Sequence, residues 1–306
     1  MRDTFFRTLA ELAERDSRIV LLTGDIGYMA IEPFSERFPE RFFNVGVAEQ
    51  NMVGLATGLA EGGFIPFVYS IVSFVVLRPY EFIRNGPILH QLPVRIVSAG
   101  GGLEYGSNGP SHYGLEDLGI LGIQPGLTLI IPADFQQARK ALTSTYDYPG
   151  PLYIRLSKDN SGLVPGLDAR FELGKAQLIG SGTDLLLVST GRITTQAVEA
   201  QKALAEKGIH CTVLVIDNLK YVPPSNLPAL LATFRRAVTV EVHYSKGGIG
   251  SLVSEVVAQG GLNCRVTCCG IHDLLDGSTG SAAYLHQKYG LTTEAILQTC
   301  LQALDQ

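Results

Sequence analysis

Short apolar segments alternate with amphipathic segments along the chain, and this alternation constrains the fold more than any other feature of the sequence. Each apolar segment is rich in Val, Ile, Leu or Phe and is bounded by Gly, Pro, Asp or Ser, which is typical of buried strands. Strands are expected at residues 18–23, 64–70, 94–99, 127–131, 152–156, 184–189, 211–216, 237–242 and 265–269. Helices are expected between them, at residues 4–14, 48–61, 78–90, 134–146, 194–207, 225–234, 250–258 and 293–304. Apolar strands joined through helices predict parallel sheets that are covered on both faces.

The length of 306 residues and one weakly patterned segment predict two domains. Residues 161–173 interrupt the alternation with loop-forming residues such as Gly162 and Pro165, so we expect them to form a linker. The first domain would then span residues 1–160 and the second residues 174–306. The predicted fold class is α/β, with two doubly wound domains, each built on a mostly parallel sheet with helices on both faces.

The composition excludes several classes of protein. Hydrophobic residues make up 46% and charged residues 17%, which excludes a disordered chain. A formal net charge of −5 argues against a nucleic-acid partner, and apolar runs shorter than the ~18 residues of a membrane span argue against a membrane protein. The five cysteines lack the C-x-x-C spacing of a zinc site, so we expect no metal site in this chain. Buried reduced thiols predict a cytoplasmic location.

The first interruption of the alternation lies at a strand-to-helix junction that contains Glu49. Residues 44–52 read NVGVAEQNM, and the helix that follows is rich in small and apolar residues. A glutamate in a first turn is favoured by the helix dipole, so Glu49 could have only this structural role. Alternatively, burial would raise the pKa of its carboxyl group, which could then share a proton with a nitrogen of a ligand.

Two further interruptions contain aromatic and polar residues. Phe74 is expected in a loop or turn before a helix with Pro79 in its first turn, where it could belong to the core or form a flat wall for a ring. Residues 100–114 contain six glycines, which predicts an irregular loop at the carboxyl edge of a sheet, a common place for ligands. The loop has neither a dinucleotide-binding nor a P-loop pattern. His112 in this loop could be a solvated side chain or an acid–base or hydrogen-bonding group.

The order and spacing of five blocks resemble the second half of the transketolase-like thiamine diphosphate enzymes. The blocks are GVAEQNM at 46–52, R-x-Y-E-x-I-R at 78–84, GPSH at 109–112, PAD at 132–134, and VEVH with GGIGS at 240–251. They are similar to the family's G-x-[RA]-E-[HQ]-x-M, R-A-Y-E-Q-I-R, G-P-T-H, P-A-D and E-E-H…G-G-L-G-S. The resemblance covers nearly the whole chain and implies the pyrimidine-binding and C-terminal domains of a split, two-subunit transketolase.

This resemblance implies a role for each candidate site residue. Glu49 would contact the aminopyrimidine ring of thiamine diphosphate and favour the imino tautomer, whose 4′-nitrogen removes the proton of the thiazolium C2. Phe74 and Ile71 would pack against the ring, and Asp25 would orient cofactor or interface groups. His112 would hydrogen-bond hydroxyls or the carbonyl oxygen of the substrate, so Glu49 and His112 are the expected catalytic residues. The implied reaction moves a two-carbon ketol unit from a ketose to an aldose.

Besides His112, four positions are expected to bind substrate, and three of these four depart from the pattern of sugar-phosphate transketolases. Gly100 stands where those enzymes carry a second His, and Asn108 stands where they carry an Asp that contacts an acceptor hydroxyl. Lys158 replaces their phosphate-binding Arg, whereas Arg2 is expected to retain the N-terminal one. A lysine attracts phosphate as a point charge but cannot bind it bidentately. The sugar or sugar-phosphate substrate is therefore expected to differ from the usual pentose phosphates, as a nucleotide-linked or unphosphorylated sugar would.

The diphosphate-binding motif of the family, G-D-G followed by an Asn, does not occur in the sequence. Gly24-Asp25-Ile26 lacks the second glycine. The resemblance therefore implies an N-terminal transketolase subunit that carries this motif and ligates Mg²⁺. We expect a heterotetramer with two copies of each chain and the active site at their interface.

Three alternative functions stay open. A β-subunit of a 2-oxo acid dehydrogenase has a similar architecture, but its usual loop is closer to Q-H-S-Q than to the GPSH at 109–112. A deoxyxylulose-phosphate synthase-like enzyme shares G-P-T-H and starts from pyruvate, but such enzymes are normally single chains. A non-catalytic scaffold subunit could retain the fold alone, although the presence of Glu49, Phe74 and His112 together argues against it.

Overall fold

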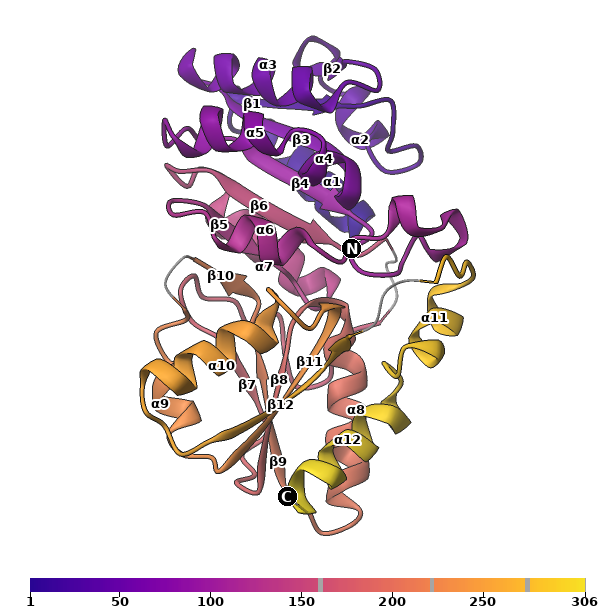
Figure 1. The fold of residues 1–306 in the computed structure, drawn as a ribbon. Coiled ribbons are helices and arrows are strands. Elements are labelled where there is room, and N and C mark those ends of the chain that lie inside the picture. Colours follow the sequence, from indigo (N-terminus) through magenta and orange to yellow (C-terminus); the bar gives the residue numbers. More distant parts are fainter. Residues whose placement is uncertain (159–161, 221–222, 273–275, 306) are drawn as a thin grey trace.

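The computed structural model describes residues 1–158, 162–220, 223–272 and 276–305, which form two α/β domains (Figure 1). The fold class predicted from the sequence is confirmed, because each domain has a mostly parallel sheet with helices on both faces. The predicted start of the linker, residue 161, lies outside the described residues. Residues 162–173 contain turns and irregular backbone and neither helix nor strand.

The sheet of the first domain has seven strands in the order β10-β5-β6-β4-β3-β1-β2 within the described residues. Six of them come from the first domain and pair in parallel: β1 (Ile19–Thr23), β2 (Phe42–Asn44), β3 (Ile65–Ile71), β4 (Arg95–Ala99), β5 (Thr128–Ile130) and β6 (Leu152–Leu156). Its helices are α1 (Arg2–Ala13), α2 (Glu32–Ser35), α3 (Glu49–Glu61), α4 (Val72–Leu77), α5 (Tyr80–Ile83), α6 (Asp117–Gly122) and α7 (Phe135–Thr145). Helices α1 and α7 pack together on one face, and α3 to α6 cover the other (Figure 1).

The second domain has a sheet of five described strands in the order β12-β11-β8-β9-β7. They are β7 (Gln177–Ile179), β8 (Leu185–Ser189), β9 (Cys211–Val215), β11 (Arg236–Tyr244) and β12 (Arg265–Ile271), and only β7 pairs antiparallel to its neighbour. The described helices are α8 (Thr194–Ala205), α9 (Leu227–Leu231), α10 (Ile249–Gln259), α11 (Ala282–Lys288) and α12 (Thr293–Asp305). Throughout the described ranges, no helix has the length and apolar character needed to cross a bilayer.

One strand of the second domain joins the sheet of the first. The short strand β10 (Asn218–Leu219) pairs antiparallel with β5 of the first domain. Just before it, Asp217 accepts a hydrogen bond from the Gln137 side chain of α7, and burial raises the pKa of Asp217 to about 8. Apolar side chains of both domains also belong to one continuous cluster. The domains therefore pack as one body, a connection that the alternation of segments does not predict.

The region around Phe74 differs from the expected loop followed by a long helix. Helix α4 follows β3 directly, so Phe74 lies in a helix rather than in a loop. The helix expected at residues 78–90 is divided: Pro79 precedes the short α5, and a π-helical turn (Arg84–Ile88) contains Pro87. A proline lacks the amide N–H and crowds the preceding turn, so it interrupts the α-helical hydrogen-bond pattern. The wider π-turn accommodates this, and Leu89 N donates to Arg84 O five residues earlier.

The predicted N-cap of α7 is confirmed. Asp134 Oδ1 accepts a hydrogen bond from Gln137 N at 2.8 Å, the pattern of a side-chain cap three residues before the donor. Its second oxygen accepts a hydrogen bond from Val164 N at 3.0 Å. The cap therefore also attaches the start of the segment between the domains to the first domain.

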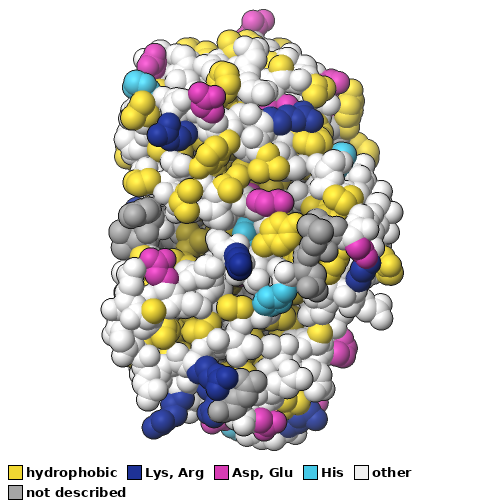
Figure 2. Space-filling model, in the orientation of Figure 1, with side chains coloured by type: hydrophobic (Ala, Val, Ile, Leu, Met, Phe, Trp, Pro, Cys, Tyr) yellow, Lys and Arg dark blue, Asp and Glu magenta, His cyan; other side chains and the backbone are white. Residues whose placement is uncertain are grey.

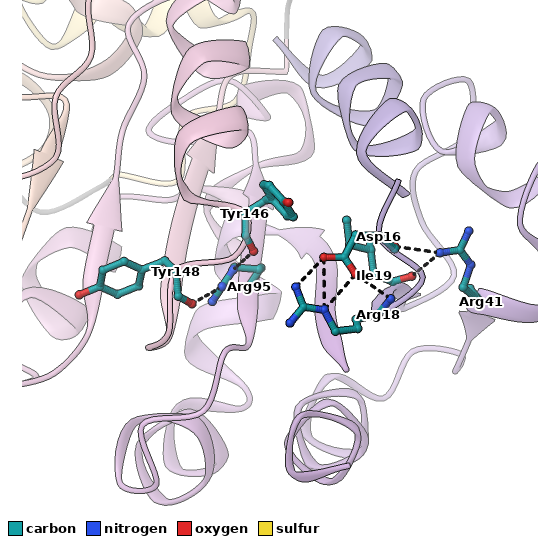
Figure 3. A network of polar contacts seen from close by, with 7 residues as sticks. All are labelled: Asp16, Arg18, Ile19, Arg41, Arg95, Tyr146 and Tyr148. Carbon is teal, nitrogen blue, oxygen red and sulfur yellow. Dashed lines mark hydrogen bonds and ion pairs between the residues drawn. The ribbon is translucent and has the colours of Figure 1, made fainter. Parts of the chain in front are cut away.

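A buried arginine holds the loop between α7 and β6 (Figure 3). Arg95, at the start of β4, is fully buried. Its guanidinium donates to the carbonyl oxygens of Tyr146 at 3.0 Å, Gly150 at 2.7 Å and Tyr148. A second, exposed pair in the same view joins Arg18 to Asp16 at 2.7 Å.

Replacing Arg95 by Met is expected to lower the free energy of unfolding by about 3 kcal/mol or more, because three carbonyl groups lose the charged donor of a fully buried arginine. The matched control is Arg18→Met, which removes an exposed ion pair and should cost less than about 1 kcal/mol. Urea unfolding monitored by circular dichroism measures both. Equal effects of the two substitutions would contradict the assignment.

Candidate functional site

The candidate residues gather at the carboxyl ends of neighbouring parallel strands. Asp25 follows β1, Ile71 ends β3, and Gly100 follows β4. In the strand register, Thr23 pairs with Tyr69 and Ile71 pairs with Ala99, so these strand ends lie at one edge of the sheet. This is the edge where open α/β sheets bind ligands.

Glu49 is a buried carboxylate at the first residue of α3, with 1% of the residue exposed. Its Oε2 accepts a hydrogen bond from Arg78 Nη1 at 2.8 Å, and its Oε1 accepts one from Ser70 Oγ at 3.3 Å. Gly46 has a φ of +72°, a conformation that glycine adopts readily, in the turn that leads into the helix. The sequence placed Glu49 at a helix start but did not predict that Arg78 and Ser70 engage its carboxylate.

Phe74 forms the centre of an aromatic and cationic cluster. The guanidinium carbon of Arg78 lies 4.1 Å from the centroid of the Phe74 ring. The rings of His112 and Phe74 make a T-shaped contact, with the centroids 5.0 Å apart. The structure therefore brings Glu49, Phe74 and His112 together through Arg78, while Ile71 is buried at the end of β3 beside α4.

Asp25 is tied to the turn before Glu49 rather than to the Phe74 cluster. Its amide N donates to Asn44 Oδ1 at 3.0 Å, and Asn44 Nδ2 donates to Asp25 Oδ1 at 3.1 Å. The amide N of Gly46 donates to the same Asn44 oxygen at 3.1 Å. Asp25 has a φ of +59°, an uncommon conformation that aspartate tolerates. The position of Asp25 fits a support for the turn that places Glu49.

The glycine-rich loop is closed at its base and contains His112. Gly102 and Gly114 exchange two backbone hydrogen bonds of 2.8 Å each. His112 lies in a short 3₁₀ turn, where its Nδ1 is 3.0 Å from Ser111 Oγ. Asn108 is exposed in a separate 3₁₀ turn, and its side-chain oxygen accepts a hydrogen bond from Ser107.

Tyr105 occupies the space beside Gly100. A Cβ atom on Gly100 would overlap the Tyr105 ring. The ring lies 6.4 Å from His112 between centroids and 4.7 Å from Lys158 Nζ. Burial raises the pKa of Tyr105, and the charge of Arg2 opposes the rise. Tyr105 thus connects three predicted substrate-binding positions, Gly100, Lys158 and Arg2, although the sequence did not single it out.

The VEVH and GGIGS block of the second domain contacts the first domain. Glu241 accepts hydrogen bonds of 2.8 Å from Ile249 N and Gly250 N at the start of α10, and burial raises the pKa of its carboxyl group to about 7. His243 Nε2 accepts a hydrogen bond from Gly119 N of the first domain at 3.3 Å. These contacts give Glu241 and His243 a structural role, and they assign neither residue a catalytic one.

The chain matches two protein families that follow one another along the sequence. Residues 1–162 match the pyrimidine-binding domain of transketolase, and residues 174–296 match the transketolase C-terminal domain.

Known proteins resemble the chain over nearly its full length. The putative transketolase C-terminal section of Methanocaldococcus jannaschii is 34% identical, over 99% of this chain and 96% of that protein. One of the subunits of the apulose-4-phosphate transketolase of Phocaeicola vulgatus is 33% identical, over 98% of this chain and 96% of that protein. A solved split gene transketolase, an inactive beta4 tetramer, has a TM-score of 0.87 at 33% identity and covers 99% of this chain and 98% of its own.

A longer protein also resembles the chain. The 1-deoxy-D-xylulose-5-phosphate synthase of Desulforudis audaxviator is 34% identical over 97% of this chain, which spans 47% of that protein.

Proposed function

Since this chain belongs to the transketolase family, as the C-terminal subunit of a split transketolase, we propose that it acts with thiamine diphosphate to move a two-carbon ketol unit from a ketose to an aldose. The observation that carries this proposal is the residue cluster at the strand ends, where Arg78 joins the buried carboxylate of Glu49 to the ring of Phe74.

The side chains of Glu49, Ile71 and Phe74 fit the aminopyrimidine end of the cofactor. A flat heteroaromatic ring needs an apolar wall and a few oriented polar groups. Phe74 is half-buried with an aromatic face, Ile71 is buried and apolar, and Glu49 offers a carboxylate. When bound, thiamine diphosphate supplies the electron sink for carbon–carbon bond cleavage.

Each site residue then has a defined task. Glu49 holds or shares a proton at a ring nitrogen of the cofactor, and Phe74 and Ile71 exclude water from that contact. With Nδ1 within 3.0 Å of Ser111 Oγ, His112 keeps Nε2 available for a hydroxyl or carbonyl oxygen of the substrate. Asp25 supports the turn before Glu49.

We assign the diphosphate end and Mg²⁺ to a partner subunit, because the sequence has no G-D-G motif. The proposed assembly is a heterotetramer of two plus two. Exposed hydrophobic side chains lie on α3, α4 and α5 and on the turn before α3: Val47, Leu55, Leu77 and Phe82 are 70%, 45%, 46% and 44% exposed. Figure 2 shows more hydrophobic side chains over the first domain than over the lower half of the second. Apolar surface of this kind supports a protein contact here.

The substrate-binding positions support a sugar other than the usual pentose phosphates. Lys158 offers a single charge in place of a bidentate arginine, and its ammonium group lies against Tyr105. Gly100 has no side chain, and the ring of Tyr105 fills the adjacent space.

The assembled enzyme is therefore expected to use xylulose 5-phosphate with ribose 5-phosphate at least about tenfold more slowly than its preferred pair, because a bidentate phosphate contact is missing. A panel of phosphorylated, unphosphorylated and nucleotide-linked ketoses, pyruvate and branched-chain 2-oxo acids, assayed as kcat/KM, measures this. A normal rate with the two pentose phosphates would refute the substrate proposal. A preference for pyruvate would favour the synthase, and one for branched oxo acids the dehydrogenase.

A further inference from the structure

Arg78 engages both groups that are proposed to receive the pyrimidine ring. Its Nη1 donates to Glu49 Oε2 at 2.8 Å, and its guanidinium carbon lies 4.1 Å from the centroid of Phe74. Ser70 donates to the other oxygen of the carboxylate, and the rings of His112 and Phe74 make a T-shaped contact. In the unloaded chain, the carboxylate of Glu49 and the ring of Phe74 thus both have partners from the chain itself.

A guanidinium group and an aminopyrimidine ring can make the same kinds of contact with Glu49 and Phe74. Both are flat, both carry N–H groups that donate to a carboxylate, and both pack on an aromatic face. Arg78 already covers one face of the Phe74 ring. A cofactor ring packed on the same face at the same distance would overlap the guanidinium group of Arg78. The arginine and the ring are therefore alternative occupants of this contact.

The position of Arg78 in the chain allows it to leave. Helix α4 ends at Leu77 and α5 begins at Tyr80, so Arg78 lies in the joint between them, next to Pro79. Its side chain is 40% exposed, whereas that of Glu49 is 2% exposed. Arg78 can rotate into solvent without moving Phe74, which is held within α4.

We propose that Arg78 occupies, in the unloaded subunit, the contacts with Glu49 and Phe74 that the pyrimidine ring takes, and that it is displaced when the cofactor ring binds. This inference rests on the proposed function and adds a positioning residue to it. Arg78 satisfies a buried carboxylate that would otherwise keep one weak hydrogen bond, so it stabilises the unloaded pocket at the expense of cofactor affinity.

The test is the affinity of the assembled two-subunit enzyme for thiamine diphosphate with Mg²⁺, measured by isothermal titration calorimetry. Arg78→Gln removes the charge and the flat cation, so it should bind the cofactor about tenfold more tightly than the wild type. Arg78→Lys can pair with Glu49 but cannot lie flat on Phe74, so its affinity should lie between the two. Arg84→Gln is the matched control, since Arg84 is exposed and its guanidinium donates to neighbouring Asn85.

The outcomes separate this inference from the function on which it rests. Tighter binding by Arg78→Gln, with Arg84→Gln unchanged, supports the displacement. Affinity that is equal to the wild type within twofold, or weaker, overturns it, provided that circular dichroism shows the same fold. If the wild-type assembly itself binds no thiamine diphosphate, the proposed function fails. A crystal structure of the loaded wild type with Arg78 still on Phe74 and Glu49 would also overturn the inference.

Discussion

Replacing Glu49 by Ala in the assembled enzyme is expected to lower kcat by about 10²- to 10⁴-fold, the usual contribution of a positioned acid–base group. The physical reason is that the buried carboxylate of Glu49 is the group proposed to hold a proton at a nitrogen of the cofactor ring. Assembly with the partner should persist, because Arg78, which loses its ion-pair partner, can reach solvent. Initial-rate kinetics and analytical ultracentrifugation measure the two quantities.

Glu61→Ala is the matched control for this experiment. Glu61 ends the same helix that Glu49 begins, and it is exposed. Its replacement should leave kcat within about twofold, as is usual for surface substitutions. If Glu49→Ala retained full activity with the partner present, Glu49 would have only a structural role and the scaffold alternative would gain support. If it prevented assembly, the experiment with Glu49→Gln would decide, because that variant keeps the shape of the side chain.

Activity and cofactor binding are both expected to depend on the partner subunit. The chain purified alone is expected to show no measurable transketolase turnover and no tight binding of thiamine diphosphate, whereas addition of the partner subunit restores both. The reason is that the residues around Glu49 are proposed to bind the pyrimidine end, while no G-D-G motif for the magnesium diphosphate occurs in the sequence. A related split gene transketolase is known as an inactive beta4 tetramer, which supports this expectation.

Calorimetry and a coupled assay on the chain alone and on the reconstituted mixture measure this dependence. The partner subunit alone is the control for activity that it would bring with it. Tight cofactor binding and turnover by this chain without any second polypeptide would refute the split arrangement. Turnover that appears only with both chains, at a rate that saturates at equal molar amounts, would support two plus two stoichiometry.

The candidate site shows which kinds of contact a sequence predicts. The N-cap at Asp134 and the helix start at Glu49 depend on residues a few positions apart, so local patterns were sufficient to place them. The pair Glu49–Arg78 joins residues 29 positions apart and depends on how β3 and α4 follow one another. The motif that contains Arg78 marked it as part of a block, but not as the partner of Glu49.

The contacts between the predicted substrate-binding residues were also not predictable from local sequence. Gly100 was noticed because a family side chain is missing there, yet the sequence did not reveal that Tyr105 fills the adjacent space. A glycine-rich loop has too many accessible backbone conformations for its side chains to be placed from spacing alone. Phe74 was expected in a loop or turn, whereas it lies in the short helix α4 that directly follows β3.

By itself, the sequence determined the α/β class, most strands and helices, and the membership in a family, because these depend on hydrophobic period and on short motifs. Only the tertiary structure decided that β10 of the second domain completes the first sheet, that Arg78 occupies the pocket of Glu49 and Phe74, and that Tyr105 lies between Gly100 and Lys158. These contacts join segments far apart in the chain. Their energies depend on sheet register and loop path, which no local pattern of residues specifies.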